Sequence, residues 1–122
     1  QTDRIPLPAI ALTTDTSALT AIGNDYGFEY LFERQVRALV SSQDVVIGIT
    51  TSGKSVNVIN GLQAAKNIGA YTIAMTGEDT PQIDAAAITL ASASKKTKVI
   101  QEIHIQLGHL ICQISEENYV SR

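Results

Sequence analysis

The chain has 122 residues, enough for one domain with a core of its own, and its net charge of −3 argues against a nucleic-acid-binding face, which would be basic. No apolar run reaches the roughly 20 residues that span a bilayer, so we expect no membrane partner. The one cysteine, Cys112, cannot form an internal disulfide, and a cytoplasmic location is therefore expected.

The first predicted elements are short. Residues Pro8–Leu12 form a continuous apolar run, which predicts a strand of a parallel sheet covered on both faces. The run Gly23–Asp25 predicts a turn, because Asn and Asp tolerate left-handed backbone and bond their own main chain. Asp25 is also a candidate to cap the next helix or to reach a ligand hydroxyl. Apolar residues then recur at helical spacing from Phe28 to Val40, which predicts an amphipathic helix.

The stretch Val45–Asn57 (VVIGITTSGKSVN) is the most informative part of the sequence. It predicts a central strand, Val45–Ile49, followed by a hydroxyl-rich loop, Thr50–Lys54, and a helix that opens at Ser55 and ends near Gly69. The free N–H groups of a helix's first turn and its dipole favour an anion, so we predict a phosphorylated small molecule as the ligand. The predicted buried face of this helix consists of Val56, Ile59, Leu62, Ala64 and Ala65.

Two further strands and a long helix follow. The strands are predicted at Tyr71–Met75 and around Ala87–Leu90, on either side of a polar loop at Thr76–Asp84. The helix, from Val99 to about Asn118, is apolar over most of its girth and is expected to be buried in the subunit or in an oligomer.

The alternation of strands and helices predicts an α/β fold, a parallel sheet with helices on both faces and right-handed crossovers. Ligands of such sheets bind beyond the carboxyl ends of the strands. The Thr50–Ser55 loop and Thr13–Asp15 are both expected at that edge.

Residues Gly48–Ser55 (GITTSGKS) also match the nucleotide-binding P-loop pattern letter for letter. A P-loop enzyme needs an acidic residue at the end of a second strand to manage Mg²⁺. The later apolar runs lead into Thr76-Gly77 and Ala91-Ser92, and neither supplies that carboxylate. A loop that binds a sugar phosphate is therefore favoured. Mg-nucleotide binding at Lys54 and Ser55 stays as a less favoured alternative.

The last helix carries His104 and His109, and histidine is the side chain best suited to exchange protons near neutral pH. Gln101 and His109 are eight residues apart, so their side chains can converge on a shared site along roughly 12 Å of helix. From the residues alone, the competing interpretation for each histidine is burial against a neighbouring partner. A metal site would need more ligands than this one helix offers.

Four segments, AIALTTD, AIGNDYG, ITTSGKSVNV and VIQEIHIQLGHLIC, follow one another in an order that resembles the sedoheptulose-7-phosphate (phosphoheptose) isomerases of the SIS (sugar isomerase) domain family. The resemblance covers nearly the whole chain and implies one SIS domain over residues 1–122, a flavodoxin-like sandwich. It implies an isomerase that converts D-sedoheptulose 7-phosphate to D-glycero-D-manno-heptose 7-phosphate through an enediol, for lipopolysaccharide core heptose biosynthesis. It also implies a cytoplasmic homotetramer with one zinc ion per subunit.

The resemblance further implies a role for individual residues. Asn24 and Asp25 would contact the sugar chain, and Gln101 would contact the substrate at its reacting end. His109 would be the catalytic acid/base residue, and Gln101 and His109 would both bind zinc. The phosphate would be held by Thr50, Thr51, Ser52 and Ser55.

Three departures from the family pattern stand out. The family's opening helices and first strand, with its general-base glutamate and half of its metal ligands, have no counterpart here, so we expect the domain to be N-terminally incomplete. Thr50 replaces the usual serine, and Lys54 stands where asparagine is common. Glu78–Gln82 replace paired glycines, so that loop is expected to take another path.

A rival function is a non-catalytic SIS interaction module of the DnaA-initiator-associating type. Modules of that type lack the second histidine of the last helix, whereas His109 is present here. The histidine favours the enzyme, and substrate turnover or metal content would separate the two functions.

Overall fold

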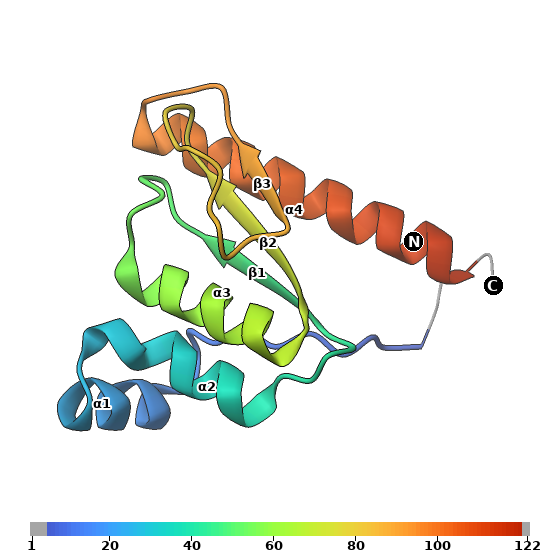
Figure 1. The fold of residues 1–122 in the computed structure, drawn as a ribbon. Helices are drawn as coiled ribbons and strands as arrows, with labels where there is room; N and C mark the ends of the chain where they lie inside the picture. The colour runs from blue at the N-terminus through green and yellow to red at the C-terminus, as the bar shows by residue number, and fades with distance from the viewer. Residues whose placement is uncertain (1–4, 121–122) are drawn as a thin grey trace.

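The computed structural model describes residues 5–120, which form a parallel sheet of three strands with helices on both sides (Figure 1). The strands pair in the order β1-β2-β3, and this arrangement confirms the predicted α/β class. The elements in chain order are α1 (Thr16–Asp25), η1 (Phe28–Tyr30), α2 (Leu31–Leu39), β1 (Val45–Ile49), α3 (Val56–Ile68), β2 (Tyr71–Thr76), β3 (Ile88–Ala91) and α4 (Thr97–Val120).

The middle position of the sheet belongs to β2, which pairs in parallel with β1 and with β3. Ile73 of β2 lies opposite Ile47 on one side and Ile88 on the other. The prediction that Val45–Ile49 is the central strand is therefore wrong. Within residues 5–120 this strand lies at an edge, because the first predicted strand does not form beside it.

Residues Pro8–Leu12 are not a strand, and Ile10 is 73% exposed. A strand needs a paired neighbour for its backbone groups, and this segment instead runs beside the helices. Leu12 packs against the apolar cluster between α2 and α3, and its carbonyl accepts a hydrogen bond from Gln35 Nε2 at 3.0 Å. Thr13–Asp15 consequently follow no strand of the sheet.

Asp15 instead begins α1, because its carboxylate accepts a hydrogen bond from the backbone N–H of Ala18 at 3.0 Å. The helix continues through Gly23–Asp25, so the turn predicted there is wrong. The chain turns two residues later, at Gly27, whose φ of 107° is a left-handed value that glycine adopts without a Cβ clash. Asp25 therefore does not cap the next helix.

The helix predicted at Phe28–Val40 is confirmed as η1 followed by α2, with Leu31 and Val36 buried. The start of α3 after Ser55 and its end at Gly69, a left-handed cap with φ 93°, are also confirmed. On α3, Leu62, Ala64 and Ala65 are buried as predicted. Val56 is 58% exposed, because it lies off the arc of the helix that faces the sheet and α2.

The core lies where α3 packs between the sheet and α2. Gly48 of β1 lets α3 approach closely, since a Cβ there would lie 2.8 Å from Leu62 Cδ1. Leu62 and Ala74 share one buried cluster with the segment after β2. A second cluster joins α2 and α3 and consists of Val36, Ala64, Ala65 and Ala70.

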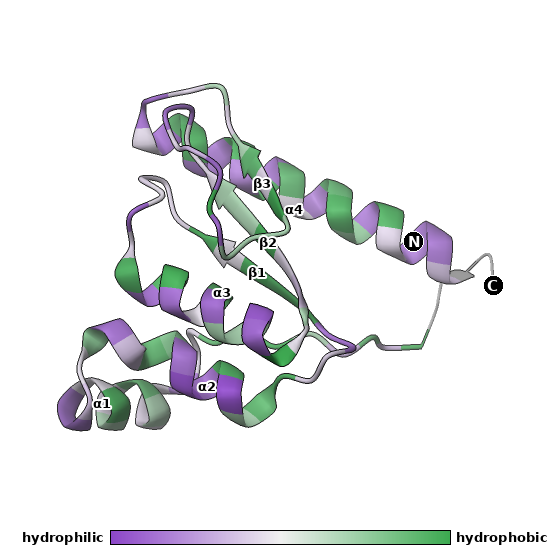
Figure 2. Ribbon diagram, in the orientation of Figure 1, coloured by the Kyte–Doolittle hydropathy of each residue, from purple (hydrophilic) through white to green (hydrophobic). Residues whose placement is uncertain are grey.

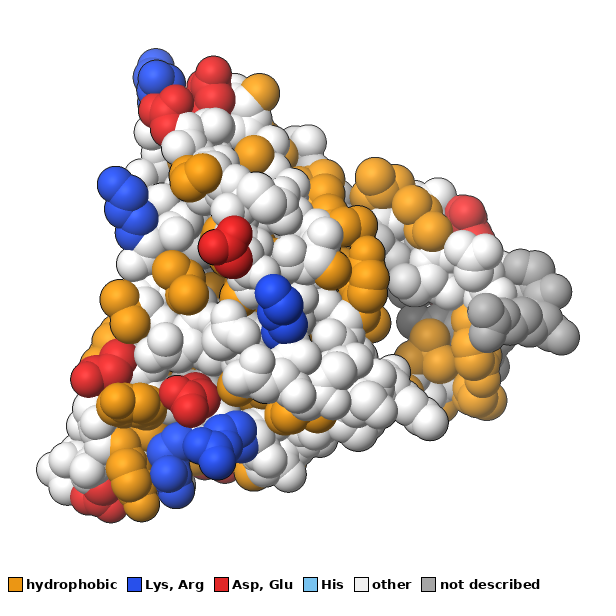
Figure 3. All heavy atoms as spheres, in the orientation of Figure 1, with side chains coloured by type: hydrophobic (Ala, Val, Ile, Leu, Met, Phe, Trp, Pro, Cys, Tyr) orange, Lys and Arg blue, Asp and Glu red, His pale blue; other side chains and the backbone are white. Residues whose placement is uncertain are grey.

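The helix α4 lies on the opposite side of the sheet, packs on β2 and then extends beyond the strands (Figure 1). Figure 2 shows hydrophobic residues recurring along α4, and Figure 3 shows hydrophobic side chains at the surface along it. Residues 5–120 do not bury this helix, since Ile105 is 62% exposed and Leu110 and Ile114 are also exposed. No helix within that range is long and apolar enough to cross a membrane.

Candidate functional site

Three loops meet at the carboxyl end of the sheet. They are residues 50–55 after β1, residues 77–87 after β2 and residues 92–96 after β3. The backbone N–H of Gly77 donates to the carbonyl of Thr51 at 3.2 Å, and the N–H of Glu78 donates to the carbonyl of Ser94 at 3.1 Å. The predicted position of the hydroxyl-rich loop is therefore confirmed.

The loop after β1 forms a small cradle of hydroxyl groups. Thr50 is buried, and its Oγ1 lies 2.9 Å from Ser55 Oγ across the loop. Gly53 closes the turn between them. Its N–H donates a hydrogen bond to the carbonyl of Thr50, and its φ of 67° is left-handed. Ser52 Oγ accepts from the N–H of Lys54 at 3.2 Å. The four hydroxyl residues predicted to hold a phosphate thus lie on one short loop.

This cradle opens onto the N-terminus of α3. Ser55 occupies the cap position, but its side chain makes no capping bond and pairs with Thr50. The first N–H groups of a helix lack backbone partners within the helix, and they and the dipole favour a negative charge. In the first turn of α3 the N–H of Val58 donates to Asn57 Oδ1 at 2.8 Å. Lys54 is exposed beside them and adds a positive charge. The arrangement suits a phosphate group.

The loop after β2 contacts the loop after β3 through Asp79, and its different path from that of the family stays a prediction. Asp79 forms an ion pair of 3.0 Å with Lys95 of the loop after β3. The hydrogen bond to Asp79, together with the charges of Asp79 and Glu78, raises the pKa of Lys95. Both partners are exposed, so the pair is worth little stability.

The two histidines of α4 have different environments. His104 is 5% exposed, and its Nε2 lies 3.1 Å from the carbonyl oxygen of Thr76. The interpretation of a buried, partnered histidine is therefore confirmed for His104 and wrong for His109, which is exposed. Gln101 is exposed as well, and both predicted residues are open to a ligand.

Asn24 and Asp25 lie at the last turn of α1, both exposed, and Asn24 Nδ2 donates to Asp25 Oδ1 at 2.8 Å. Within residues 5–120 no hydrogen bond joins either side chain to the Thr50–Ser55 loop. Their role as sugar contacts stays a prediction.

A zinc site is not complete within the described part of the chain. No group of three or more His, Cys, Asp or Glu side chains in that part could hold a metal ion. Gln101 and His109 offer two donors on one helix, whereas zinc takes about four ligands. Further ligands would have to come from elsewhere.

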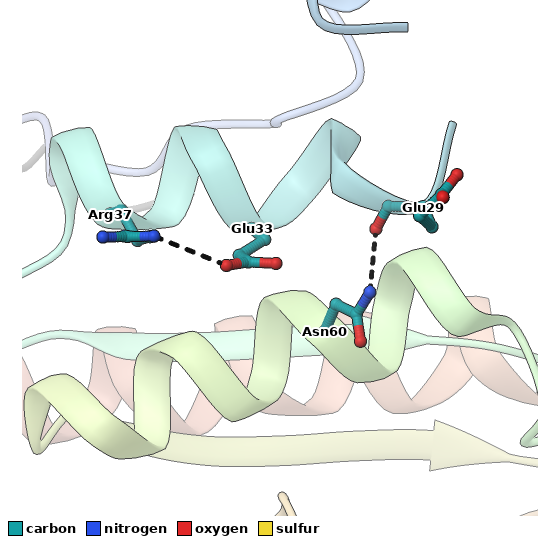
Figure 4. Close-up of polar contacts among 4 residues, drawn as sticks. All are labelled: Glu29, Glu33, Arg37 and Asn60. Carbon is teal, nitrogen blue, oxygen red and sulfur yellow. Dashed lines mark hydrogen bonds and ion pairs between the residues drawn. The ribbon is translucent and has the colours of Figure 1, made fainter. Parts of the chain in front are cut away.

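Two hollows of the surface lie beside α3. One, of about 440 Å³, lies between α2 and α3, where Glu33 and Arg37 form an ion pair of 3.7 Å and Asn60 Nδ2 donates to the carbonyl of Glu29 at 3.1 Å (Figure 4). Another, of about 360 Å³, lies between α3 and residues 81–85. Neither is lined by Gln101 or His109, whereas Gly53 of the cradle loop lines the second.

Comparison with known proteins gives consistent matches. The model of the SIS domain family matches residues 1–77. The phosphoheptose isomerase of Aquifex aeolicus is 57% identical over 121 residues, which cover 98% of this chain and 63% of the relative. That of Aliarcobacter butzleri is 55% identical over 115 residues, which cover 93% and 61%.

Solved structures of the same enzyme are similar in fold. Phosphoheptose isomerase from Neisseria gonorrhoeae has a TM-score of 0.80 at 49% identity, covering 86% of this chain and 60% of that chain. The one from Francisella tularensis has a TM-score of 0.85 at 39% identity, covering 91% and 60%. The chain thus spans about three fifths of the length of these relatives. Because the family model matches more than half of it, the chain belongs to the SIS domain family.

Proposed function

We propose that this chain forms the larger part of a phosphoheptose isomerase, which converts D-sedoheptulose 7-phosphate to D-glycero-D-manno-heptose 7-phosphate for lipopolysaccharide core heptose biosynthesis. The observation that carries the proposal is the hydroxyl cradle of Thr50–Ser55 at the N-terminus of α3, where the Ser55 side chain makes no capping bond. Relatives that bear this name at 55–57% identity support it.

The phosphate end of the substrate is bound by the cradle. Thr50, Thr51, Ser52 and Ser55 donate hydrogen bonds to the phosphate oxygens, and the first turn of α3 adds its N–H groups and dipole. Lys54 contributes a nearby positive charge. Asn24 and Asp25 contact hydroxyl groups of the sugar chain.

The reacting end lies along α4. Ketose–aldose interconversion moves a proton between adjacent carbons through an enediol, so it needs a base, an acid for the oxygen atoms and stabilisation of the oxyanion. His109 exchanges the proton at the oxygen atoms, and Gln101 donates a hydrogen bond to one of them. The general-base glutamate comes from outside residues 5–120.

We also infer one zinc ion per subunit, held by Gln101 and His109 with ligands from outside the described residues. When bound, zinc polarises the substrate oxygens.

The apolar residues exposed on α4, among them Ile105 and Leu110, support a homo-oligomer, and we infer a cytoplasmic homotetramer.

Zinc content tests this inference without any assay of activity. The complete gene product that contains this chain should bind zinc at one ion per subunit, and His109→Ala should lose most of it because one of the two donors on α4 is gone. Elemental analysis after gel filtration measures the ratio. Gln106→Ala, an exposed polar position on the same helix, is the matched control. Full zinc occupancy in His109→Ala would remove His109 from the ligand set.

The alternatives have less support. The strand β1 continues through Gly48 to Ile49, and Gly48 packs against α3 rather than opening a phosphate loop. The strands β2 and β3 end at Thr76 and Ala91, which supply no carboxylate for Mg²⁺. The non-catalytic SIS module is disfavoured by the presence of His109.

The function itself is tested by turnover. The complete protein should convert sedoheptulose 7-phosphate to the aldose 7-phosphate. NMR spectra of the two sugar phosphates measure this conversion over time. If the protein binds the sugar phosphate but does not convert it, the isomerase function is wrong and the non-catalytic SIS module becomes the favoured function. If the protein binds a Mg-nucleotide but not the sugar phosphate, the P-loop function becomes the favoured one.

A further inference from the structure

One peptide group lies between α4 and the phosphate cradle. It joins Thr76, the last residue of β2, to Gly77. Its carbonyl oxygen lies 3.1 Å from His104 Nε2 of α4, and its N–H donates to the carbonyl of Thr51 in the cradle at 3.2 Å. Because a peptide group is planar and rigid, these two hydrogen bonds place α4 and the cradle relative to one another.

Gly77 is closely packed on two sides, against the backbone of the cradle and against a side chain of α4. A Cβ at this position would lie 2.7 Å from the carbonyl oxygen of Thr51 and 2.8 Å from Ile100 Cδ1 of α4. The carbonyl of Thr76 is also held by the residue directly after β3, since it accepts from the N–H and the Oγ of Ser92 at 2.9 and 2.6 Å. The peptide group therefore has little freedom to move.

The chemistry of His104 fixes its hydrogen bond. A carbonyl oxygen can only accept, so a hydrogen bond at this distance requires the tautomer with its proton on Nε2, and in that tautomer Nδ1 is a bare acceptor. Nδ1 is buried and has no hydrogen-bond partner among residues 5–120. A buried acceptor left unpaired destabilises the fold, and an apolar side chain would fill this space without that penalty. The imidazole is thus poorly explained by packing alone.

We propose that His104 is a positioning residue, which holds Gln101 and His109 at a fixed place relative to the phosphate cradle. Gln101 lies one turn before it on α4 and His109 lies five residues after it. The helix rests on β2 and then runs beyond the sheet (Figure 1), so a fixed point near its start determines where both side chains lie. The inference rests on the proposed isomerase function.

Two substitutions at this position separate the hydrogen bond from the volume it occupies. In His104→Leu an apolar side chain fills the space and no donor reaches Thr76. In His104→Gln the amide nitrogen can take the place of Nε2 and donate to the same carbonyl. Leu107→Ala, at a half-buried position of the same helix, removes packing but leaves this hydrogen bond, and it is the control for lost stability.

The assay measures kcat and KM for sedoheptulose 7-phosphate in the complete protein, together with the thermal midpoint. For His104→Leu we expect kcat to fall roughly 10- to 100-fold, the size of a misplacement near 1 Å, with KM close to the wild-type value because the cradle keeps its own hydrogen bonds. His104→Gln should recover most of kcat. Leu107→Ala should lower the thermal midpoint and keep kcat.

The outcomes distinguish this inference from the function on which it rests. An inactive wild type overturns both. An active wild type with unchanged kcat in His104→Leu, or with no recovery in His104→Gln, overturns the positioning role alone. If the leucine variant does not fold, the glutamine variant decides, and nitrogen NMR of the wild-type ring adds a second readout. A proton on Nδ1 with a bare Nε2 would contradict the hydrogen bond to Thr76.

Discussion

Replacing His109 by Ala in the complete protein is expected to lower kcat by about 10²- to 10⁴-fold, the usual contribution of a positioned acid/base group. Affinity for the sugar phosphate should change little, because His109 lies on α4 and the phosphate is held by the Thr50–Ser55 cradle. Steady-state kinetics with sedoheptulose 7-phosphate gives kcat, and titration calorimetry with the same sugar phosphate gives the affinity.

The matched control for this variant is Gln106→Ala. Gln106 is exposed on the same helix, and substitutions at such positions are usually within about 0.5 kcal/mol of neutral. Its kcat should therefore stay near the wild-type value. A wild-type kcat in His109→Ala, or an equal loss of kcat in both variants, would contradict the assignment of His109 as the proton-exchanging group.

Local signals predicted the elements around the cradle well. The apolar run Val45–Ile49 is β1, and the change from β-branched residues to hydroxyl residues marks its end at Thr50. Gly69 ends α3 in the left-handed conformation that favours glycine. These features depend on residues close together in the chain, which is why the sequence alone identifies them.

Strand pairing was harder to predict because it depends on distant residues. Pro8–Leu12 has the apolar composition of a buried strand, yet it pairs with no strand of residues 5–120 and has no regular secondary structure. Periodicity likewise identified the apolar character of α4 but not what covers it, and Ile105 and Ile114 are exposed.

The candidate site shows the same division. The cradle is a single loop, and its position between β1 and α3 is predicted by the sequence, while the phosphate-binding role of its hydroxyl residues stays a prediction. The link from α4 to the cradle was not predicted, since His104 and Thr76 are 28 residues apart in the chain. The available signals were a histidine on the apolar side of the helix and a glycine directly after β2. Neither signal indicates which residue it contacts in the fold.

Substituting Gly77 by Ala is expected to impair both ends of the site at once. The new methyl group would lie 2.7 Å from the carbonyl oxygen of Thr51, so the backbone of the cradle must shift, and 2.8 Å from Ile100 Cδ1, so the end of that α4 side chain must be displaced. Overpacking of this kind costs about 1–3 kcal/mol of unfolding free energy. We expect KM to rise and kcat to fall, with kcat/KM lower by about 100-fold.

Gly108→Ala is the matched control, because it adds the same methyl group to a glycine that has nothing within 4 Å of the new Cβ. Gly108 lies inside α4, where alanine is favoured over glycine by about 1 kcal/mol, so its unfolding free energy should rise. Gly77 does not have a left-handed φ, so a loss confined to Gly77→Ala must come from the close approach of the cradle and α4. Unfolding in urea and steady-state kinetics measure the two effects. Equal kcat/KM in the two variants would show that α4 and the cradle need not be held so closely together.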